Sequence, residues 1–266
     1  IAAVDGDKIF INGKSLGFQL PAEQNGKTIQ AIGDAKLNTT TKKFGSASLQ
    51  LDGVGDAAKI NTNADFGFGT GDFTIDFWAY PNAVQTTSLI DMRNNVTVEN
   101  ALYFYVANNV PKVYVNGADI ITGSQGFNLS TWTHCEIVRS SGTITVYING
   151  SSVGSASASA DFANAKPLVI GNNYGNTNGW NGYIDGLRVY KGQALHTGNF
   201  TAPTTEAVGN ANTKLVANFN GNNASTTFLD TNLIAQDIRT SAGATATSFT
   251  LLSLIHISEP TRHTSI

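Results

Sequence analysis

The stretch from Trp132 to Gly150, WTHCEIVRSSGTITVYING, constrains the fold of this chain most, because it has the pattern of a β-hairpin. In its second arm Ile144, Val146 and Ile148 alternate with other residues, the period of two of a half-buried strand. Asn149-Gly150 then tolerates the positive φ of a further turn. Because an isolated hairpin cannot bury its own apolar face, further strands must cover it.

Those further strands are present in the sequence. In Phe73–Pro81 the residues Phe73, Ile75, Phe77 and Ala79 share one face, while Asp76 and Trp78 lie on the other. Short alternating runs recur up to Tyr183–Tyr190, and helical periodicity of useful length occurs nowhere. The pattern therefore predicts an all-β chain folded as a two-sheet antiparallel sandwich.

Four segments occur in a fixed order: FGSASLQLDG (44–53), GTGDFTIDFWAYP (69–81), TWTHCEIVRSSGTITVYING (131–150) and WNGYIDGLRVYKG (180–192). Together they resemble the motifs of laminin-G-like jelly rolls in the concanavalin A-like lectin and glucanase superfamily. The chain resembles the copies of this domain that occur in phage tail and virion structural proteins. The resemblance implies a concanavalin A-like jelly roll, with Asp185 and Arg188 as a structural pair near the closing strand.

The domain boundaries follow from these motifs. We expect a lead-in with a hairpin around Asn12-Gly13 in residues 1–29, the jelly roll in residues 30–205, and a linker with the start of a truncated second copy in residues 206–251. LSLIHISEPTR (252–262) resembles a translated sequencing adapter, so residues 252–266 are expected to be an artefact. The chain begins at Ile1 without a Met and is expected to be a fragment of a longer, metagenomic sequence.

The composition limits the classes of partner that the chain is expected to bind. Charged residues make up 13% of the chain and the formal net charge is −3, which argues against nucleic acid and anionic membranes. No apolar run is long enough to predict membrane insertion. The single Cys135 is expected to be a small buried hydrophobe.

Catalysis is not expected. Glycoside hydrolases that resemble this chain carry two Glu residues around an Asp on one strand, because an acid and a nucleophile must flank one glycosidic bond. No two of the Glu residues here share a predicted strand, and Glu136 stands where the family usually has a small residue. We expect no catalytic residues, with Glu136 and Asp76 as hydrogen-bonded carboxylates on a sheet face.

A calcium ion is an open alternative. Related laminin-G and lectin domains often hold Ca²⁺ at the loop rim through Asp, Asn and backbone oxygens. Asp52, Asp56 and Asp91 lie in or beside turns, although without a recognised ligand spacing. Side chains of this kind more often cap their own turn, which is the favoured interpretation.

The loop GNNYGNTNGWNG (171–182) is the candidate ligand site. Carbohydrate binding needs an aromatic ring for the apolar face of a sugar and amides for its hydroxyls. Tyr174 offers the ring, and the amides come from Asn172, Asn173, Asn176 and Asn178. A sheet face with Asp76, Trp78 and Glu136 is the second candidate. The family resemblance implies that Trp180 packs in the core.

These features predict a non-catalytic recognition module, directed at a carbohydrate, in a phage tail or virion structural protein. Its partners would be a cell-surface glycan or other virion proteins, and its location the virion or the extracellular space. A structural spacer without a ligand is the alternative, and a glycan-active enzyme of the same fold is third.

Overall fold

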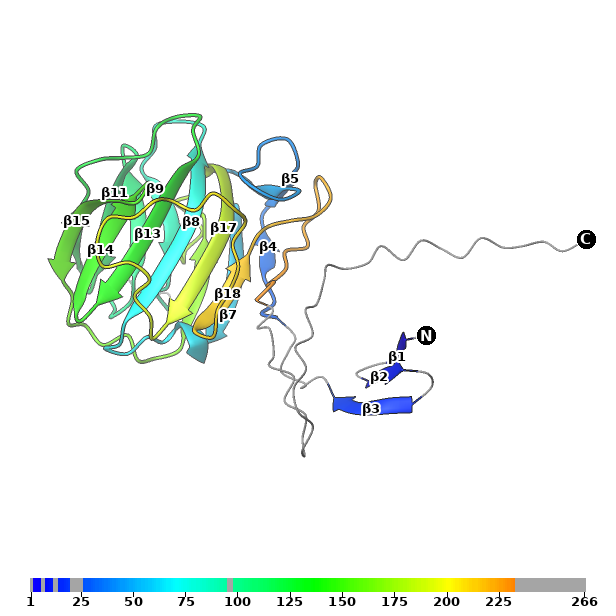
Figure 1. The fold of residues 1–266 in the computed structure, drawn as a ribbon. Helices are drawn as coiled ribbons and strands as arrows, with labels where there is room; N and C mark the ends of the chain where they lie inside the picture. Colours follow the sequence, from blue (N-terminus) through cyan, green and yellow to red (C-terminus); the bar gives the residue numbers. More distant parts are fainter. Residues whose placement is uncertain (1, 6–7, 12–13, 20–25, 95–97, 233–266) are drawn as a thin grey trace, which may run out of the picture. The chain divides into compact units, whose positions relative to one another are not determined.

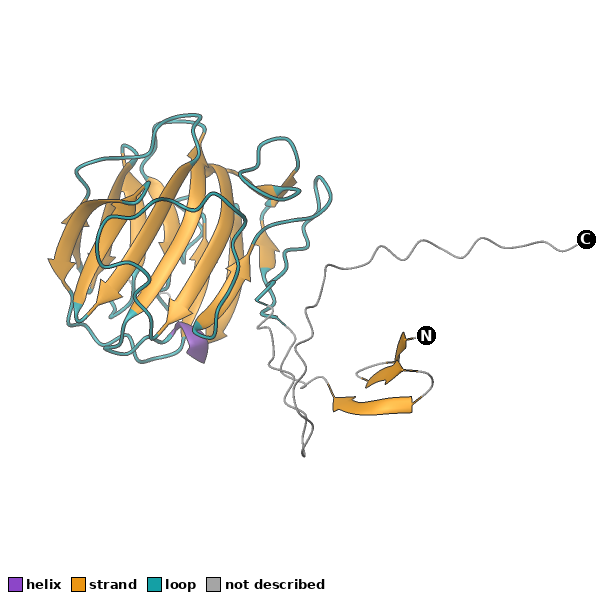
Figure 2. Cartoon of the chain, viewed as in Figure 1, coloured by secondary structure: helices purple, strands orange, loops and turns teal. Residues whose placement is uncertain are grey.

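The computed structural model describes residues 2–5, 8–11, 14–19, 26–94 and 98–232. Strands dominate these residues, and the one helical element among them is the short 3-10 helix η1 (Ala64–Phe66) (Figure 2). Strands β1 (Ala2–Asp5), β2 (Lys8–Ile11) and β3 (Lys14–Gln19) form a separate antiparallel sheet. Strand β2 pairs with β3, and Asn12-Gly13, where the sequence predicts the turn of a hairpin, lies outside the described residues.

The main body is a sandwich of two antiparallel sheets (Figure 1). The seven-stranded sheet has the order β12 (Ala118–Thr122), β11 (Val110–Val115), β10 (Tyr103–Ala107), β9 (Thr87–Asp91), β16 (Lys166–Ile170), β7 (Ala57–Asn63) and β4 (Gln30–Ile32). The eight-stranded sheet has the order β15 (Ser151–Ser157), β14 (Thr143–Ile148), β13 (Thr133–Ser140), β8 (Phe73–Pro81), β17 (Asn181–Lys191), β6 (Ser48–Asp52) and β5 (Lys36–Asn38), with β18 (Thr213–Ala217) beside β17. The predicted all-β sandwich is confirmed.

The core lies between the two sheets, where the predicted alternation places it. Ile75 of β8 is in register with Ile137 of β13, and both are fully buried. Across the sandwich the rings of Phe77 and Phe104 lie 6.1 Å apart, centroid to centroid. Cys135 and Trp180 are also completely buried, as the sequence predicts.

The segment after β17 crosses the outer face of the eight-stranded sheet, and residues 192–207 are called the strap below. Figure 1 shows this segment in yellow, in front of β13 and β14. The backbone N–H of Phe200 donates to the carbonyl of Gly150 at 2.9 Å. The hydroxyl of Thr74 donates to the carbonyl of Gln193 and accepts from the N–H of Leu195. The strap is thus fixed to β8 and to the turn after β14.

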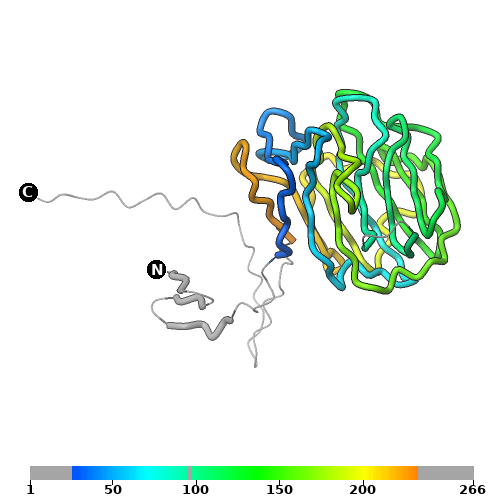
Figure 3. The backbone as a smooth tube through the Cα atoms, turned by 180° about the vertical axis from the view of Figure 1, so that it is seen from behind, coloured from blue at the N-terminus to red at the C-terminus, as the bar shows by residue number. Residues whose placement is uncertain are grey.

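The sandwich extends beyond residue 205, where the sequence pattern predicts its end. Residues 213–217 form β18, which pairs with β17, and Phe219 and Phe228 belong to the buried core. Phe228 also forms a β-bridge with Ile29, so that the incoming and outgoing segments run side by side (Figure 3). The expected boundary is therefore corrected to about residue 232. Residues 233–251 and the adapter-like residues 252–266 lie outside the described residues.

Candidate functional site

The outer face of the eight-stranded sheet carries the predicted set Asp76, Trp78 and Glu136. Asp76 and Glu136 are cross-strand neighbours. The exposed fractions of the three residues are 1%, 7% and 0%. The strap covers this part of the sheet: Nδ1 of His196, a strap residue, lies 2.9 Å from Oε1 of Glu136. All three side chains are therefore buried, and Glu136 holds the strap in place, while ligand binding through this set stays a prediction.

The pKa values of the two carboxyl groups under the strap are shifted in opposite directions. Burial alone would raise the pKa of Asp76, but a hydrogen bond to His134 and the guanidinium of Arg188 hold it below its ordinary value. Burial and the nearby Asp76 raise the pKa of Glu136 to about 9. A charged Asp76 thus lies beside a protonated Glu136, which can donate to the ring of His196.

Arg188 does not pair with Asp185, contrary to the sequence-based expectation. Its Nε donates to Oδ1 of Asp76 at 3.0 Å. The carboxylate of Asp185 instead accepts the backbone N–H groups of Lys43 and Phe44 at 2.8 and 3.1 Å. Both residues have structural roles, but with different partners.

The loop between β16 and β17 is braced from within by Asn172. Its side chain is completely buried, and its Nδ2 donates to the carbonyl of Asp56 at 3.0 Å and to Oδ1 of Asn176 at 2.7 Å. Its Oδ1 accepts the backbone N–H groups of Asn173 and Asn178, both at 2.9 Å. Asn172 therefore shapes the loop and is not displayed on its surface.

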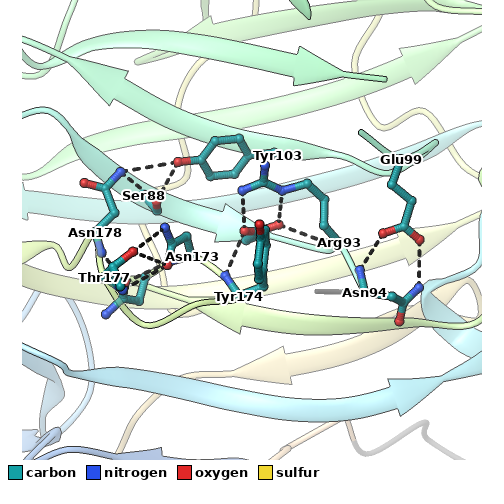
Figure 4. A network of polar contacts seen from close by, with 11 residues as sticks. Ser88, Arg93, Asn94, Glu99, Tyr103, Asn173, Tyr174, Thr177 and Asn178 are labelled. Atoms are coloured by element: carbon teal, nitrogen blue, oxygen red, sulfur yellow. Dashed lines mark hydrogen bonds and ion pairs between the residues drawn. The ribbon is translucent and has the colours of Figure 1, made fainter. Parts of the chain in front are cut away.

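The other loop amides link the loop to the seven-stranded sheet and to itself (Figure 4). Nδ2 of Asn178 lies 3.2 Å from Oγ of Ser88 and 3.4 Å from the hydroxyl of Tyr103. Oδ1 of Asn173 accepts the N–H of Thr177 at 3.0 Å. Asn176 donates to the carbonyl of Gly55 at 2.7 Å. These bonds preset the loop before any ligand arrives.

Tyr174 lies against the sheet and is half-buried. Its backbone N–H donates to Oδ2 of Asp91 at 2.9 Å. Asp91 also holds Arg93 bidentately, with contacts of 2.9 and 2.8 Å. The guanidinium of Arg93 lies 4.8 Å from the ring centre of Tyr174 and 3.8 Å from that of Tyr103. A stack of ring, guanidinium and ring results (Figure 4).

The stack continues across β10 and β11. The rings of Tyr103 and Tyr105 are nearly parallel, with centroids 5.0 Å apart and planes at 10°. Tyr114, which pairs with Tyr103 across the strands, meets its ring edge to face at 6.0 Å. Arg93 and four tyrosines are together called the tyrosine face below. The four tyrosines are Tyr103, Tyr105, Tyr114 and Tyr174.

Polar groups of fixed orientation border the tyrosine face. The hydroxyl of Tyr105 donates to the carboxylate of Asp119 at 2.8 Å, and Nζ of Lys112 lies 3.2 Å from the same carboxylate. Neither this border nor the tyrosines on β10 and β11 were predicted from the sequence. The signal was the tyrosine at alternate positions of YFYVA, with a third tyrosine in the following strand.

A group of carboxylates lies at the rim beside the loop. One oxygen each of Asp34, Asp52 and Asp56 falls within 4.8 Å of the others. Oxygen ligands suit Ca²⁺. Asp56, however, already accepts the N–H of Asp34 at 2.8 Å and that of Asp52 at 3.1 Å, which is a turn-capping role. Asp91 is engaged with Arg93 and does not belong to the group. Calcium binding through Asp52 and Asp56 stays an open alternative, to which the structure adds Asp34.

Solved structures with a similar fold include several carbohydrate-related domains. Domain 4 of an extracellular arabinanase from Geobacillus stearothermophilus, solved with arabinotriose, has 16% identity and a TM-score of 0.48, covering 61% of this chain and 78% of that domain. The binding domain of botulinum neurotoxin DC, solved in complex with SialylT, has 13% identity and a TM-score of 0.47, covering 64% and 44%. A Trypanosoma rangeli sialidase mutant has 14% identity and a TM-score of 0.49, covering 63% and 28%.

No curated protein sequence matches the chain. Within the described residues, no helix has the length and apolar character needed to cross a membrane. The family model described as the concanavalin A-like lectin/glucanases superfamily, a laminin-G model, matches residues 52–198, more than half of the chain. This chain therefore belongs to the concanavalin A-like lectin/glucanase superfamily.

Proposed function

We propose that this domain is a carbohydrate-binding module and that it recognises its glycan on the tyrosine face. The observation that carries the proposal is the stack in which Arg93, fixed by Asp91, lies between the rings of Tyr103 and Tyr174. Rings held in this way offer the apolar face of a sugar a surface that loses little freedom on binding.

The exposed parts of the face suit a polyhydroxylated ligand. Three of its rings are partly exposed, those of Tyr105, Tyr114 and Tyr174. Tyr103 and Arg93 are buried beneath them, with exposed fractions of 8% and 5%. Hydrogen-bonding groups of Asp119, Lys112 and Thr177 lie at the border, where sugar hydroxyls can reach them. Pre-set polar groups around an apolar centre are typical of ligand sites.

The module is proposed to bind without catalysis. The two carboxyl groups on the opposite sheet are buried beneath the strap, and Asp76 is neutralised by Arg188. An acid and a nucleophile for glycoside hydrolysis must both reach the substrate. Incubating the protein with every glycan that it binds and assaying new reducing ends tests this point, and sustained release of reducing sugar would contradict it.

The binding test begins with a glycan array and continues with calorimetric titration of the strongest hit. Tyr105→Ala and Tyr114→Ala should each weaken binding by about 1 kcal/mol, because each removes an exposed ring from the face. Val208→Ser is the control, since Val208 is 72% exposed and directly follows the strap, which crosses the other sheet. If the parent protein binds no glycan on the array, the proposal is overturned and the spacer alternative is favoured.

A place in a phage tail or virion structural protein, and with it a virion or extracellular location, is also proposed. It rests on the motif resemblance alone. Recovering the full-length gene with its neighbours tests it, since flanking genes for tail or capsid proteins are expected. A genomic setting without virion genes would contradict it.

A further inference from the structure

A second group of aromatic side chains lies on the outer face of the eight-stranded sheet, at the end that the strap leaves uncovered. Tyr80 of β8 is in register with Tyr183 of β17. The pairing of Thr133 with Ala79 places Trp132 opposite Tyr80 on the other side. The ring centroids of Trp132 and Tyr80 are 5.5 Å apart, and those of Tyr80 and Tyr183 are 5.7 Å apart. These three residues are called the aromatic row.

The aromatic row is open to solvent although its neighbours are not. Trp132, Tyr80 and Tyr183 are each half-buried. Two residues further along the same strands, His134 and Trp78 are buried under the strap. In residues 26–94 and 98–232, the hydrogen bonds and ring contacts of the strap fall on other residues, such as Glu136 and Tyr147, and none falls on the row.

The polar atoms of the row have no partners within the described part of the chain. The hydroxyls of Tyr80 and Tyr183 and the indole Nε1 of Trp132 make no hydrogen bond there, and none of these atoms is buried. An apolar partner would cover these three donors without offering acceptors. Sugar hydroxyls can accept from them while C–H groups pack on the rings. The chemistry of the row therefore favours a polyhydroxylated partner.

The charge around the row selects among such partners. Gln50 of β6 pairs with Tyr183 and continues the row with an amide, and Asn82 follows β8 at the same end. The next position outward is Lys36, whose ammonium lies 3.6 Å from the carboxylate of Asp34. The row itself is uncharged and its nearest cation in register is already paired. An uncharged ligand matches it, and an acidic polysaccharide does not.

We propose that the aromatic row is a second binding surface, which takes an uncharged polysaccharide chain laid across β13, β8 and β17. The proposal shares its ligand class with the proposed function but none of its residues, so either can fail alone. With both surfaces in use, one domain would hold two chains, or two parts of one chain, on opposite sides of the sandwich.

The structural alternative is that the row only stabilises the sheet. Neighbouring rings meet at 59° and 74°, and tilted or edge-to-face pairs of this kind stabilise a fold by themselves. A loss of binding must therefore be separated from a loss of folding. The indole N–H of Trp132 provides the means, because the chain has three tryptophans and the other two, Trp78 and Trp180, are 7% and 0% exposed.

The experiment records the three indole signals of ¹⁵N-labelled full-length protein by NMR. The probes are neutral hexasaccharides of glucose, xylose, mannose and arabinose, with hexagalacturonic acid as the acidic comparison. Trp132→Phe assigns the exposed signal. At least one neutral probe should shift the Trp132 signal in a saturable way and leave the signals of Trp78 and Trp180 in place. Tyr80→Ala should weaken this binding about tenfold while the other two indole signals stay at their parent positions.

The outcomes separate the two surfaces. If Tyr105→Ala removes binding on the tyrosine face but the Trp132 signal still shifts, the row is a site of its own. If no neutral probe moves the Trp132 signal, the proposal for the row is overturned, whatever the tyrosine face does. A shift caused by phosphatidylcholine vesicles and by no hexasaccharide would assign the row to a lipid surface and would also overturn it. Tighter binding of hexagalacturonic acid than of any neutral probe would contradict the charge argument.

Discussion

The carboxyl group of Glu136 and the imidazole of His196 share one hydrogen bond, with Oε1 and Nδ1 2.9 Å apart, and this bond joins the strap to the centre of the eight-stranded sheet. Glu136 is completely buried, and its other charged neighbours are Asp76 and Arg188. The bond makes the stability of the domain dependent on pH, because neither partner titrates at its ordinary value.

The first prediction gives the sign of this dependence. The pKa of Glu136 rises from 4.5 to about 9 in the folded protein. The folded state thus keeps a proton that the unfolded chain releases, so this contribution to stability is complete below pH 4.5 and is lost as the pH rises toward 9. Glu136→Gln keeps a donor for His196 without titrating. It should raise the unfolding free energy at pH 8 by about 2 kcal/mol or more, measured by urea denaturation.

His196 contributes with the opposite sign. Its pKa is lowered from 6.5 by burial, so its contribution is present above pH 6.5 and is lost as the pH falls. Repeating the denaturation at pH 5 and pH 8 separates the two groups. Equal stability of the parent and Glu136→Gln across this range would show that Glu136 is ionised in the folded state.

The second prediction concerns the ion pair between Arg188 and Asp76. Arg188→Met leaves the buried carboxylate of Asp76 without a counter-charge and should cost about 3–5 kcal/mol of unfolding free energy. Adding Asp76→Asn to that variant removes the unpaired charge and should restore much of the loss. A double-mutant cycle by chemical denaturation measures the coupling. Additive effects of the two substitutions would mean that the pair contributes nothing of its own.

The third prediction contrasts two aromatic residues of the loop between β16 and β17. Trp180→Ala should cost about 3 kcal/mol of stability, because its ring is completely buried against Phe127. Tyr174→Ala should cost about 1 kcal/mol, since it removes the stacking of a half-buried ring on Arg93. Thermal melts with a glycan titration of each variant test both values. Binding at parent strength by Tyr174→Ala would remove this ring from the proposed tyrosine face.

The fourth prediction concerns truncation. A chain ending at Thr205 lacks β18, Phe219 and Phe228 and should melt at a much lower temperature, if it folds at all. A chain ending at Asn232 keeps every described contact of the sandwich. Deleting residues 252–266 alone should leave the melting temperature unchanged, as expected of an adapter-derived sequence. A loss of several degrees on that deletion would show that those residues belong to the fold.

The fifth prediction tests calcium. If Asp34, Asp52 and Asp56 hold Ca²⁺, adding millimolar calcium should raise the melting temperature of the parent and should not raise that of Asp52→Asn. Magnesium serves as the control cation, because it demands a tighter octahedral geometry. An unchanged melting temperature would leave Asp56 with the turn-capping role alone.

Much of the fold is predictable from local pattern. Alternation in residues 73–81 and 143–148 fixes which side chains face the core, because a strand has a side-chain period of two. The place of Cys135 in the central hairpin and the family resemblance at Trp180 predict that both side chains are buried, and both are. The family motifs add the order of these strands along the chain.

The strap and β18 could not be predicted in this way. The strap has few apolar side chains, and its position depends on contacts distant in sequence, such as that of Phe200 with Gly150. The alternating run at residues 213–217 reads the same whether it pairs with β17 or begins another domain. The burial of Asp76, Trp78 and Glu136 follows from the strap, so it was missed with it. Tyr174 was predicted as a ring beside amides, but its support by Arg93 depends on a residue distant in the chain.

The bridge between Ile29 and Phe228 has a mechanical consequence for any longer chain that carries this domain. The two segments that enter and leave the sandwich are neighbours, and a second bond joins the N–H of Leu37 to the carbonyl of Ser225. Tension along such a chain would break the hydrogen bonds between these two segments one after another before it acts on the two sheets. The two sheets would then lie outside the line of force and would stay folded while the contacts between the two segments break.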